Sequence, residues 1–288
     1  MSRTEDQQHP TASDVRESLH TLALPDKVAG IWSLGQAGFV VAWNGIKVMI
    51  DPYLSDWVYE LAGKPWVREF APPLHPAEDL GIDYVLCTHH HEDHMDKLTL
   101  HALAQASART VFVVPTAHIQ LMNDYGIPSS RIRGIDHGEC LNLHGGISVH
   151  AHAAKHEDYA TTEDGHHHFL SYVLRFGEDL DLFHSGDTIA FRELEDWVKP
   201  FQPDIAMLPI NGRDFVRQSA GIAGNMNYRE AADFGARVGA RLLVPMHVGL
   251  FKHNDENPAY FVDYLKIAYP NQAFHLFAPG ERLCFLKG

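Results

Sequence analysis

The stretch Thr88-His89-His90-His91-Glu92-Asp93-His94 places imidazole and carboxylate side chains at the spacing His-x-His-x-Asp-His. It follows the apolar run 83–87, which predicts a short buried strand. These side chains therefore lie on a tight loop at the end of a strand. On such a loop His89 and His91 can turn toward one point, while Asp93 and His94 turn toward a neighbouring point. Because two-metal hydrolytic sites hold their ions about 3.5–4 Å apart, the loop predicts a site for two cations.

This spacing resembles the signature of the metallo-β-lactamase-fold hydrolases. The resemblance implies an α/β fold, the αββα sandwich, with the site on loops at one edge of the paired sheets. In that family an aspartate and two further histidines at the ends of later strands complete the site. The segments 183–188 and 244–247 stand in the right order to supply Asp187, which would bridge both metals, and His247.

The remaining ligand is a choice between His152 and His156. His156 is preferred because the family ligand tends to close an Ala-x-His step where a strand enters a loop, whereas His150 and His152 share one face of the strand. The resemblance thus implies two groups of ligands with Asp187 between them. They are His89, His91 and His156 for one metal, and Asp93, His94 and His247 for the other.

Further stretches resemble the branch of this family that contains L-ascorbate-6-phosphate lactonase. They are residues 31–38, 50–52, 88–96, 183–187, 204–213 and 243–254. The resemblance implies that Asn211, Arg213 and Asn254 bind the substrate, with the Arg213 guanidinium forked onto a phosphate. The chain departs from that branch at 213–221, an insertion-like stretch, and lacks its longer C-terminal extension.

The composition is that of a globular protein: 288 residues, 45% hydrophobic, with a mean hydropathy of −0.20. No apolar stretch approaches the ~18 residues that cross a bilayer, and residues 1–14 lack the apolar core of a secretion signal. A cytoplasmic protein with no membrane partner is therefore expected. A formal net charge of −14 repels nucleic acid. A small anionic substrate fits, because two cations reverse the field inside a pocket. A homo-oligomer is compatible with these features.

One shared site predicts one domain at 21–288, after a polar leader at 1–20. Asn44-Gly45 predicts a hairpin and so an antiparallel start. Cys87, Cys140 and Cys284 are expected to be buried and unpaired. The other strands are predicted at 28–34, 39–43, 46–50, 110–114, 147–153, 169–176, 180–183, 204–209 and 241–245, and the helices at 96–106, 116–125, 228–238 and 258–268.

The polar segment 157–168 follows His156 and is expected to form a flap over the site. Its run His166-His167-His168 favours a solvated loop over a third metal site. Asp51 ends a strand in the same part of the fold as the ligand loop. Its expected role is to orient a ligating histidine from behind.

Imidazole and carboxylate ligands without thiolate suit Zn²⁺, Mn²⁺ or Fe. Two such ions lower the pKa of a shared water toward ~7 and polarise a carbonyl. The expected enzyme is a metal-dependent hydrolase that opens a lactone or related ester of a small, phosphorylated sugar acid by attack of a metal-bound hydroxide. Asp93 would be the catalytic residue, orienting the nucleophile and taking its proton. The alternatives are a small-molecule or lipid phosphodiesterase and a non-catalytic metal-binding protein that retains the fold.

Overall fold

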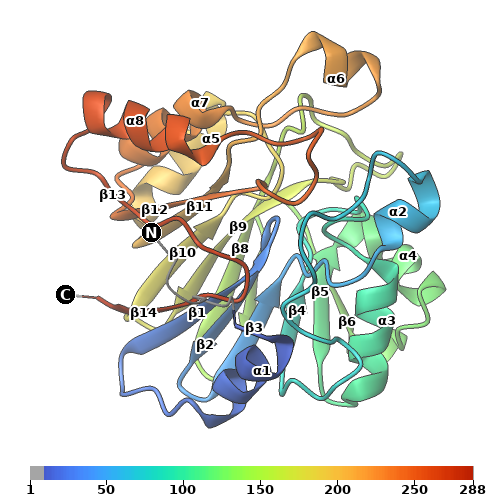
Figure 1. Cartoon of the computed structure of the whole chain (residues 1–288). Coiled ribbons are helices and arrows are strands. Elements are labelled where there is room, and N and C mark those ends of the chain that lie inside the picture. Colours follow the sequence, from blue (N-terminus) through green and yellow to red (C-terminus); the bar gives the residue numbers. More distant parts are fainter. Residues whose placement is uncertain (1–9, 288) are drawn as a thin grey trace, which may run out of the picture.

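The apolar runs of the sequence form strands that pair into two seven-stranded sheets, packed face to face (Figure 1). The structure, a computed structural model, describes residues 10–287. The first sheet has the spatial order β14 (Arg282–Leu286), β1 (Val28–Gly35), β2 (Gly38–Trp43), β3 (Ile46–Ile50), β4 (Tyr84–Leu86), β5 (Val111–Pro115) and β6 (Ile132–Ile135). The second has the order β13 (Ala273–Phe274), β12 (Leu242–Met246), β11 (Ile205–Pro209), β10 (Leu180–His184), β9 (Leu170–Phe176), β8 (Ile147–Ala153) and β7 (Cys140–Leu143).

Helices cover the outer faces of both sheets (Figure 1), which confirms the expected αββα sandwich. On the side of the first sheet lie α1 (Ala12–Thr21), α3 (Lys97–Ala106) and α4 (Ile119–Asp124), and on the side of the second α5 (Arg192–Val198), α7 (Tyr228–Arg237) and α8 (Pro258–Ala268). The shorter elements are α2 (Trp57–Ala62), α6 (Phe215–Ser219), η1 (Thr116–His118), η2 (Ser129–Arg131) and η3 (Lys199–Phe201). The helix predicted at 116–125 is thus η1 followed by α4.

Each sheet combines an antiparallel part with a parallel part. In the first sheet β1, β2 and β3 are antiparallel, and β3 to β6 are parallel. In the second, β7 to β10 are antiparallel, and β10 to β13 are parallel. Parallel strands end at the same edge of a sheet. The loops that follow β4, β10 and β12 are therefore available to build one site.

Three apolar layers hold the sandwich together. The central layer joins both sheets and includes Val41 and Val113 from one and Leu182 and Val244 from the other. A second cluster lies between the first sheet and its helices, and a third fills the space between the second sheet and its helices. The strands of the central layer are buried on both faces, and for this reason they appear in the sequence as continuous apolar runs.

Helix α1 differs from the polar leader expected at residues 1–20. Thr11 and Asp14 form a capping box at its start, and Val15 and Leu19 are buried in the cluster against the first sheet. The indole Nε1 of Trp32 donates to Ser18 Oγ at 2.8 Å. The helix therefore packs against the domain, on the leader side of the boundary expected at residue 20. Residues 1–9 lie outside the described residues. The apolar periodicity of this helix is weak in the sequence, because only two of its side chains are buried.

The predicted absence of disulfides holds for all three cysteines, and the predicted burial holds for one of them. Cys87 is buried and unpaired, whereas Cys140 and Cys284 are exposed. Both exposed residues lie on edge strands, β7 and β14, whose outer faces meet solvent.

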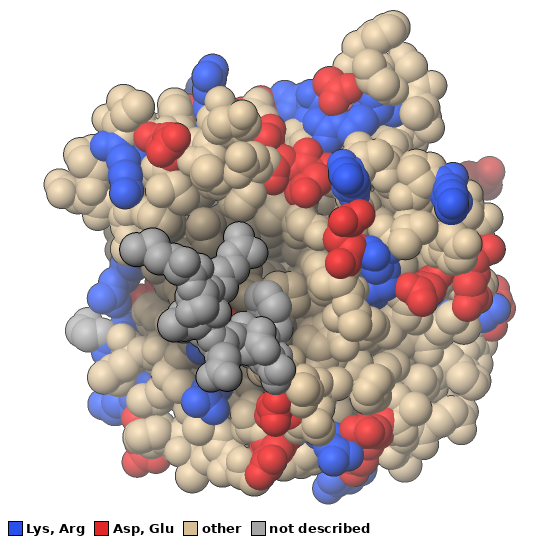
Figure 2. Space-filling view, in the orientation of Figure 1, with Lys and Arg blue, Asp and Glu red and all other residues tan. Residues whose placement is uncertain are grey.

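The face seen in Figure 2 carries acidic and basic side chains interspersed. Within residues 10–287, no helix is long and apolar enough to cross a membrane.

Substitution of Leu19 measures how much α1 contributes to the domain. Leu19→Ala should lower the free energy of unfolding by about 2–5 kcal/mol, the cost of emptying a buried leucine site. Glu17→Ala, an exposed change in the same helix, should stay within about 0.5 kcal/mol of wild type. Urea denaturation measures both. Equal stability of the two variants would mean that α1 is a dispensable leader.

Candidate metal centre

The ligand loop 88–94 is fixed at both ends. Before it, the Cys87 amide donates to the Val113 carbonyl of the neighbouring strand β5 at 2.9 Å. After it, buried Asp96 caps α3, and its carboxylate accepts the backbone N–H groups of Leu98 and Thr99. Within the loop the amides of His94 and Met95 both donate to the His91 carbonyl. The histidines are thus presented by a tight turn between a strand end and a helix cap, as the sequence predicts.

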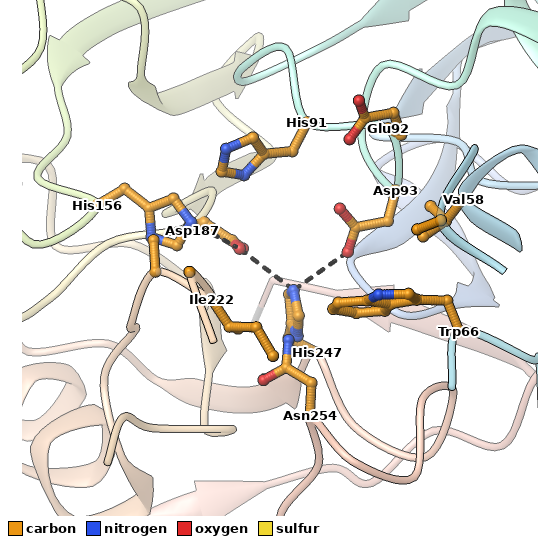
Figure 3. Close-up of a pocket in the computed structure, with 13 residues that line it drawn as sticks. Val58, Trp66, His91, Glu92, Asp93, His156, Asp187, Ile222, His247 and Asn254 are labelled. Atoms are coloured by element: carbon orange, nitrogen blue, oxygen red, sulfur yellow. Dashed lines mark ion pairs between the residues drawn. The ribbon is translucent and has the colours of Figure 1, made fainter. Parts of the chain in front are cut away.

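The expected ligands converge in two groups. His89, His91 and His156 form one group, and Asp93, His94 and His247 form the other; within each, the candidate ligand atoms lie within 4.8 Å of one another. Asp187 contacts both groups. Its Oδ1 is 3.3 Å from His94 Nε2, and its Oδ2 is 3.2 Å from His247 Nε2 and 3.8 Å from His156 Nε2. Figure 3 shows Asp187 between His156 and His247.

Several of these atoms are buried and have no hydrogen-bond partner. They include His89 Nε2, His94 Nε2 and Asp187 Oδ1. Buried polar atoms are almost always paired, and each unpaired one costs about 1–3 kcal/mol. Lone pairs that point at a common centre without a protein partner are what a bound cation requires. The residues therefore fit divalent metal ions on both sides of Asp187.

Asp51 orients a ligand on each side of the centre. Its Oδ2 accepts a hydrogen bond from Nδ1 of His94 at 2.8 Å and from the Thr88 hydroxyl at 2.6 Å. The oxygen of the Thr88 hydroxyl in turn accepts a hydrogen bond from Nδ1–H of His89 at 3.0 Å. When these histidines are neutral, as metal binding requires, both hydrogen bonds leave the lone pair on Nε2, the atom that faces the centre. This arrangement suits the supporting role expected of Asp51, which the Thr88 hydroxyl would extend to His89 in the other ligand group.

His156 and His152 have different surroundings. Nδ1 of His156 donates to the Gly224 carbonyl at 3.0 Å, which leaves Nε2 for the centre. The ring of His152 packs instead on His137 and Trp197, at centroid distances of 4.5 and 5.0 Å. The structure therefore brings His156, and not His152, to His89 and His91.

The pKa values of the histidines are shifted in opposite directions in the two groups of candidate ligands. Burial lowers the pKa of His91 to about 3 and also lowers those of His89 and His156, so these rings are neutral. Burial would also lower the pKa of His247, but Asp187 and Asp93 raise it to about 9. The same carboxylates raise the pKa of buried His94. Metal binding at the second group must therefore displace protons.

Residues that the sequence analysis did not assign to the site complete its surroundings. The side-chain Nε2 of Gln36 donates to Asp93 Oδ2 at 2.8 Å, and the backbone carbonyl of Gln36 accepts the backbone N–H of His247. Asn225 Nδ2 donates to Asp187 Oδ2 at 2.9 Å. Gln36 could have been found, because it follows the strand end in a Gly-Gln-Ala-Gly turn that resembles the family. No local pattern marks Asn225, which acts through a tertiary contact.

A pocket of about 220 Å³ opens onto the centre (Figure 3). Its metal-binding floor contains His91, Asp93, His156, Asp187 and His247. The remaining lining residues are largely apolar: Val58, Ala62, Trp66, Glu92, Gly221, Ile222, Ala223 and Asn254.

The three expected substrate-binding residues lie at different distances from this pocket. Asn254 lines it, whereas Asn211 is buried behind, donating to Asn254 Oδ1 at 3.0 Å and accepting from Asn225. Arg213 does not line the pocket. Its guanidinium forms a bidentate ion pair with the carboxylate of Glu230, and both N···O distances are 2.7 Å.

The segment 157–168 is solvated, as expected, because its residues are exposed or half-buried. It folds back on itself, with the His168 amide donating to the Ala160 carbonyl at 2.9 Å. The rings of His166 and His167 both donate to Asp136, at 2.8 and 2.9 Å. The histidine run is therefore anchored, because a carboxylate from another part of the chain, after β6, reaches it.

Asp51→Asn should weaken metal binding by about 10- to 100-fold, because asparagine keeps one acceptor oxygen, whereas the carboxylate accepts hydrogen bonds from Thr88 and His94 with both. Competition with a chromophoric chelator measures the affinity. Thr88→Val removes the hydroxyl that links Asp51 to His89 but leaves the hydrogen bond between Asp51 and His94, so it should weaken one ion more than the other. Asp179→Asn is the control, because Asp179 accepts an indole N–H from Trp43. Unchanged affinity in Asp51→Asn would contradict the orienting role.

Comparison with known proteins agrees with this geometry. A family model described as "Beta-lactamase superfamily domain" matches residues 47–248, more than half of the chain. A UPF0173 metal-dependent hydrolase of Caldivirga maquilingensis is 26% identical over 250 residues, covering 87% of this chain and 95% of the relative.

Two solved structures share the fold. Igni18, a metallo hydrolase of Ignicoccus hospitalis, is 21% identical with a TM-score of 0.65, covering 90% of this chain and 98% of Igni18. An isothiocyanate hydrolase from Delia radicum gut bacteria is 17% identical with a TM-score of 0.71, covering 90% of this chain and 100% of its own. The chain belongs to the β-lactamase superfamily, and it is a relative of proteins named metal-dependent hydrolases.

Proposed function

We propose that this protein is a metal-dependent hydrolase that opens a lactone or a related ester of a small molecule. The observation that carries the proposal is the convergence of two ligand groups, with unpaired buried lone pairs, at the floor of a pocket. A purely structural metal site is closed by its ligands, whereas a catalytic one keeps an open position. Two divalent ions held there would lower the pKa of a water between them and polarise a carbonyl oxygen.

Asp93 is the residue best suited to take a proton from an attacking water. Its side chain keeps 17% of its surface exposed and lines the pocket, whereas the side chain of Asp187 keeps 4%. The hydrogen bond from Gln36 and the ion pairs with His94 and His247 all fall on Oδ2. Among the described residues, Oδ1 has no such partner, so it can turn to the reacting group.

The wall of the pocket favours a substrate with an apolar part. Trp66 presents its indole next to the centre in Figure 3, and its ring is held edge-on by Phe251 at a centroid distance of 5.2 Å. Val58 and Ile222 also line the space. A flat, partly apolar acyl or lactone ring can pack on such a wall while its carbonyl faces the metal ligands.

The charges around the pocket supply little support for a phosphate group. Arg213 is held by Glu230, and Arg217 by Asp214, with the Arg217 guanidinium also donating to the Asn211 carbonyl. No lysine or arginine is among the pocket-lining residues of the described chain. The substrate that we propose is therefore a lactone or ester, without the phosphate group of a sugar acid.

Asp93→Asn should reduce turnover by ~10²-fold or more, because the amide cannot take a proton from the attacking water. Steady-state kinetics with metal-loaded enzyme measure the change, and elemental analysis checks the metal content of each sample. Asp179→Asn serves as the matched carboxylate control. Near-normal turnover in Asp93→Asn with full metal content would restrict Asp93 to a structural role.

Arg213→Ala should change kcat/KM for phosphorylated and unphosphorylated forms of one substrate by the same factor, because Arg213 lies outside the pocket lining and is paired with Glu230. A direct phosphate clamp would instead cost the phosphorylated form about 1.5–3 kcal/mol more. Glu230→Gln is the control, since it breaks the same ion pair from the other side. A loss confined to the phosphorylated form in Arg213→Ala alone would restore the phosphate clamp.

The reaction class is tested with a panel of substrates on metal-loaded protein. The panel contains γ- and δ-lactones with and without a phosphate, carboxylic esters, and phosphodiesters. Hydrolysis of lactones or esters that is lost in Asp93→Asn supports the proposal. Turnover of phosphodiesters alone would replace it with a phosphodiesterase, and no turnover at full metal content would favour a non-catalytic metal-binding protein.

A further inference from the structure

A second histidine cluster lies behind the ligand loop and consists of His90, His118 and His168. One ring nitrogen from each lies within 4.8 Å of those of the other two. The ring centroids are 4.7 Å apart for His90 and His118, 5.1 Å for His118 and His168, and 5.8 Å for His90 and His168. None of the three lines the pocket.

The hydrogen bonds leave free lone pairs in this cluster. Nε2 of His118 donates to the His168 carbonyl at 2.9 Å, so its Nδ1 keeps the lone pair. This is the arrangement of most ligating histidines, which donate their other ring N–H to a carbonyl or a carboxylate. Nδ1 of His90 and Nδ1 of His168 are buried and have no hydrogen-bond partner. Burial lowers the pKa of His118 to about 4, so its ring is neutral and can bind a cation.

We propose that His90, His118 and His168 form a third metal site, separate from the pocket, that takes Zn²⁺ or a similar imidazole-binding ion. Three imidazoles without a carboxylate suit zinc, copper or nickel better than calcium or magnesium. Zn–N bonds of about 2.0–2.1 Å in tetrahedral geometry require nitrogens about 3.4 Å apart. Because the nitrogens now lie within 4.8 Å of one another, the side chains would rotate toward a common point on binding, and a water would fill the fourth position.

An ion at this site would connect three parts of the fold. His90 belongs to the ligand loop, His118 ends η1 after strand β5 of the first sheet, and His168 ends the segment before β9 of the second sheet. The residue after His168, Phe169, packs its ring on His89, His91 and His156, at centroid distances of 5.2, 5.4 and 5.4 Å. The ion would therefore hold both sheets and the Phe169 ring against one group of catalytic ligands.

The test compares zinc content in His118→Gln and wild type. Glutamine can still donate to the His168 carbonyl, but it is a poor zinc ligand. The full chain is stripped with a chelator, reloaded with excess Zn²⁺, desalted and measured by elemental analysis. His144→Gln is the matched control, because His144 is exposed. Wild type and His144→Gln should bind one more equivalent of zinc than His118→Gln does, whatever the occupancy of the centre at Asp187.

A structure of the zinc-loaded wild type gives a second measurement that does not depend on the folding of a variant. An anomalous peak between the three rings, in data collected above the zinc edge, is the expected result. Zinc should also raise the melting temperature of wild type more than that of His118→Gln. Equal zinc content in wild type and His118→Gln, or no peak between the rings, would overturn the third site without bearing on the hydrolase proposal.

Discussion

The buried carboxylate of Asp51 is the constraint on which the rest of the centre depends. It lies at the end of β3, fully buried, and accepts hydrogen bonds from the Thr88 amide, the Thr88 hydroxyl and His94. A buried charge is tolerated only when such partners surround it. The same bonds fix which nitrogen of His89 and of His94 faces the metals. One carboxylate thus contacts the start of the ligand loop and, directly or through Thr88, one histidine of each candidate ligand group.

The arrangement works because the parallel strands β3 and β4 are neighbours, with Ile50 paired to Leu86. The residues immediately after them, Asp51 and the ligand loop, therefore emerge side by side. The same holds in the second sheet, where Asp187 follows β10 and His247 follows β12 with β11 between them. Topology brings together side chains that are far apart in the sequence, and the metal ligands need only small loops to reach one another.

The sequence predicted the features that are encoded locally. Continuous apolar runs identified most strands of both sheets, and the spacing of residues 88–94 identified a metal loop, because strand burial and ligand spacing are short-range patterns. Features that depend on contacts between residues far apart in the chain were not predicted from the sequence. Arg213 was expected at a phosphate, but Glu230, on helix α7, binds its guanidinium. Asn225 contacts the site through its hydrogen bond to Asp187, and α1 packs on the domain through buried side chains. Neither tertiary contact is marked by a local sequence pattern.

The centre also explains how an acidic protein can bury several carboxylates at one point. Asp93 and Asp187 lie against His94 and His247, and the pKa of His247 is raised to about 9 by these partners. Without metals, protons on the histidines balance the carboxylates. When divalent cations bind, they displace these protons and supply the balancing charge themselves. Metal binding therefore exchanges protons for metal ions, so the buried carboxylates are balanced by positive charge with and without metals. As the pH falls, protons compete with the metals for the histidines.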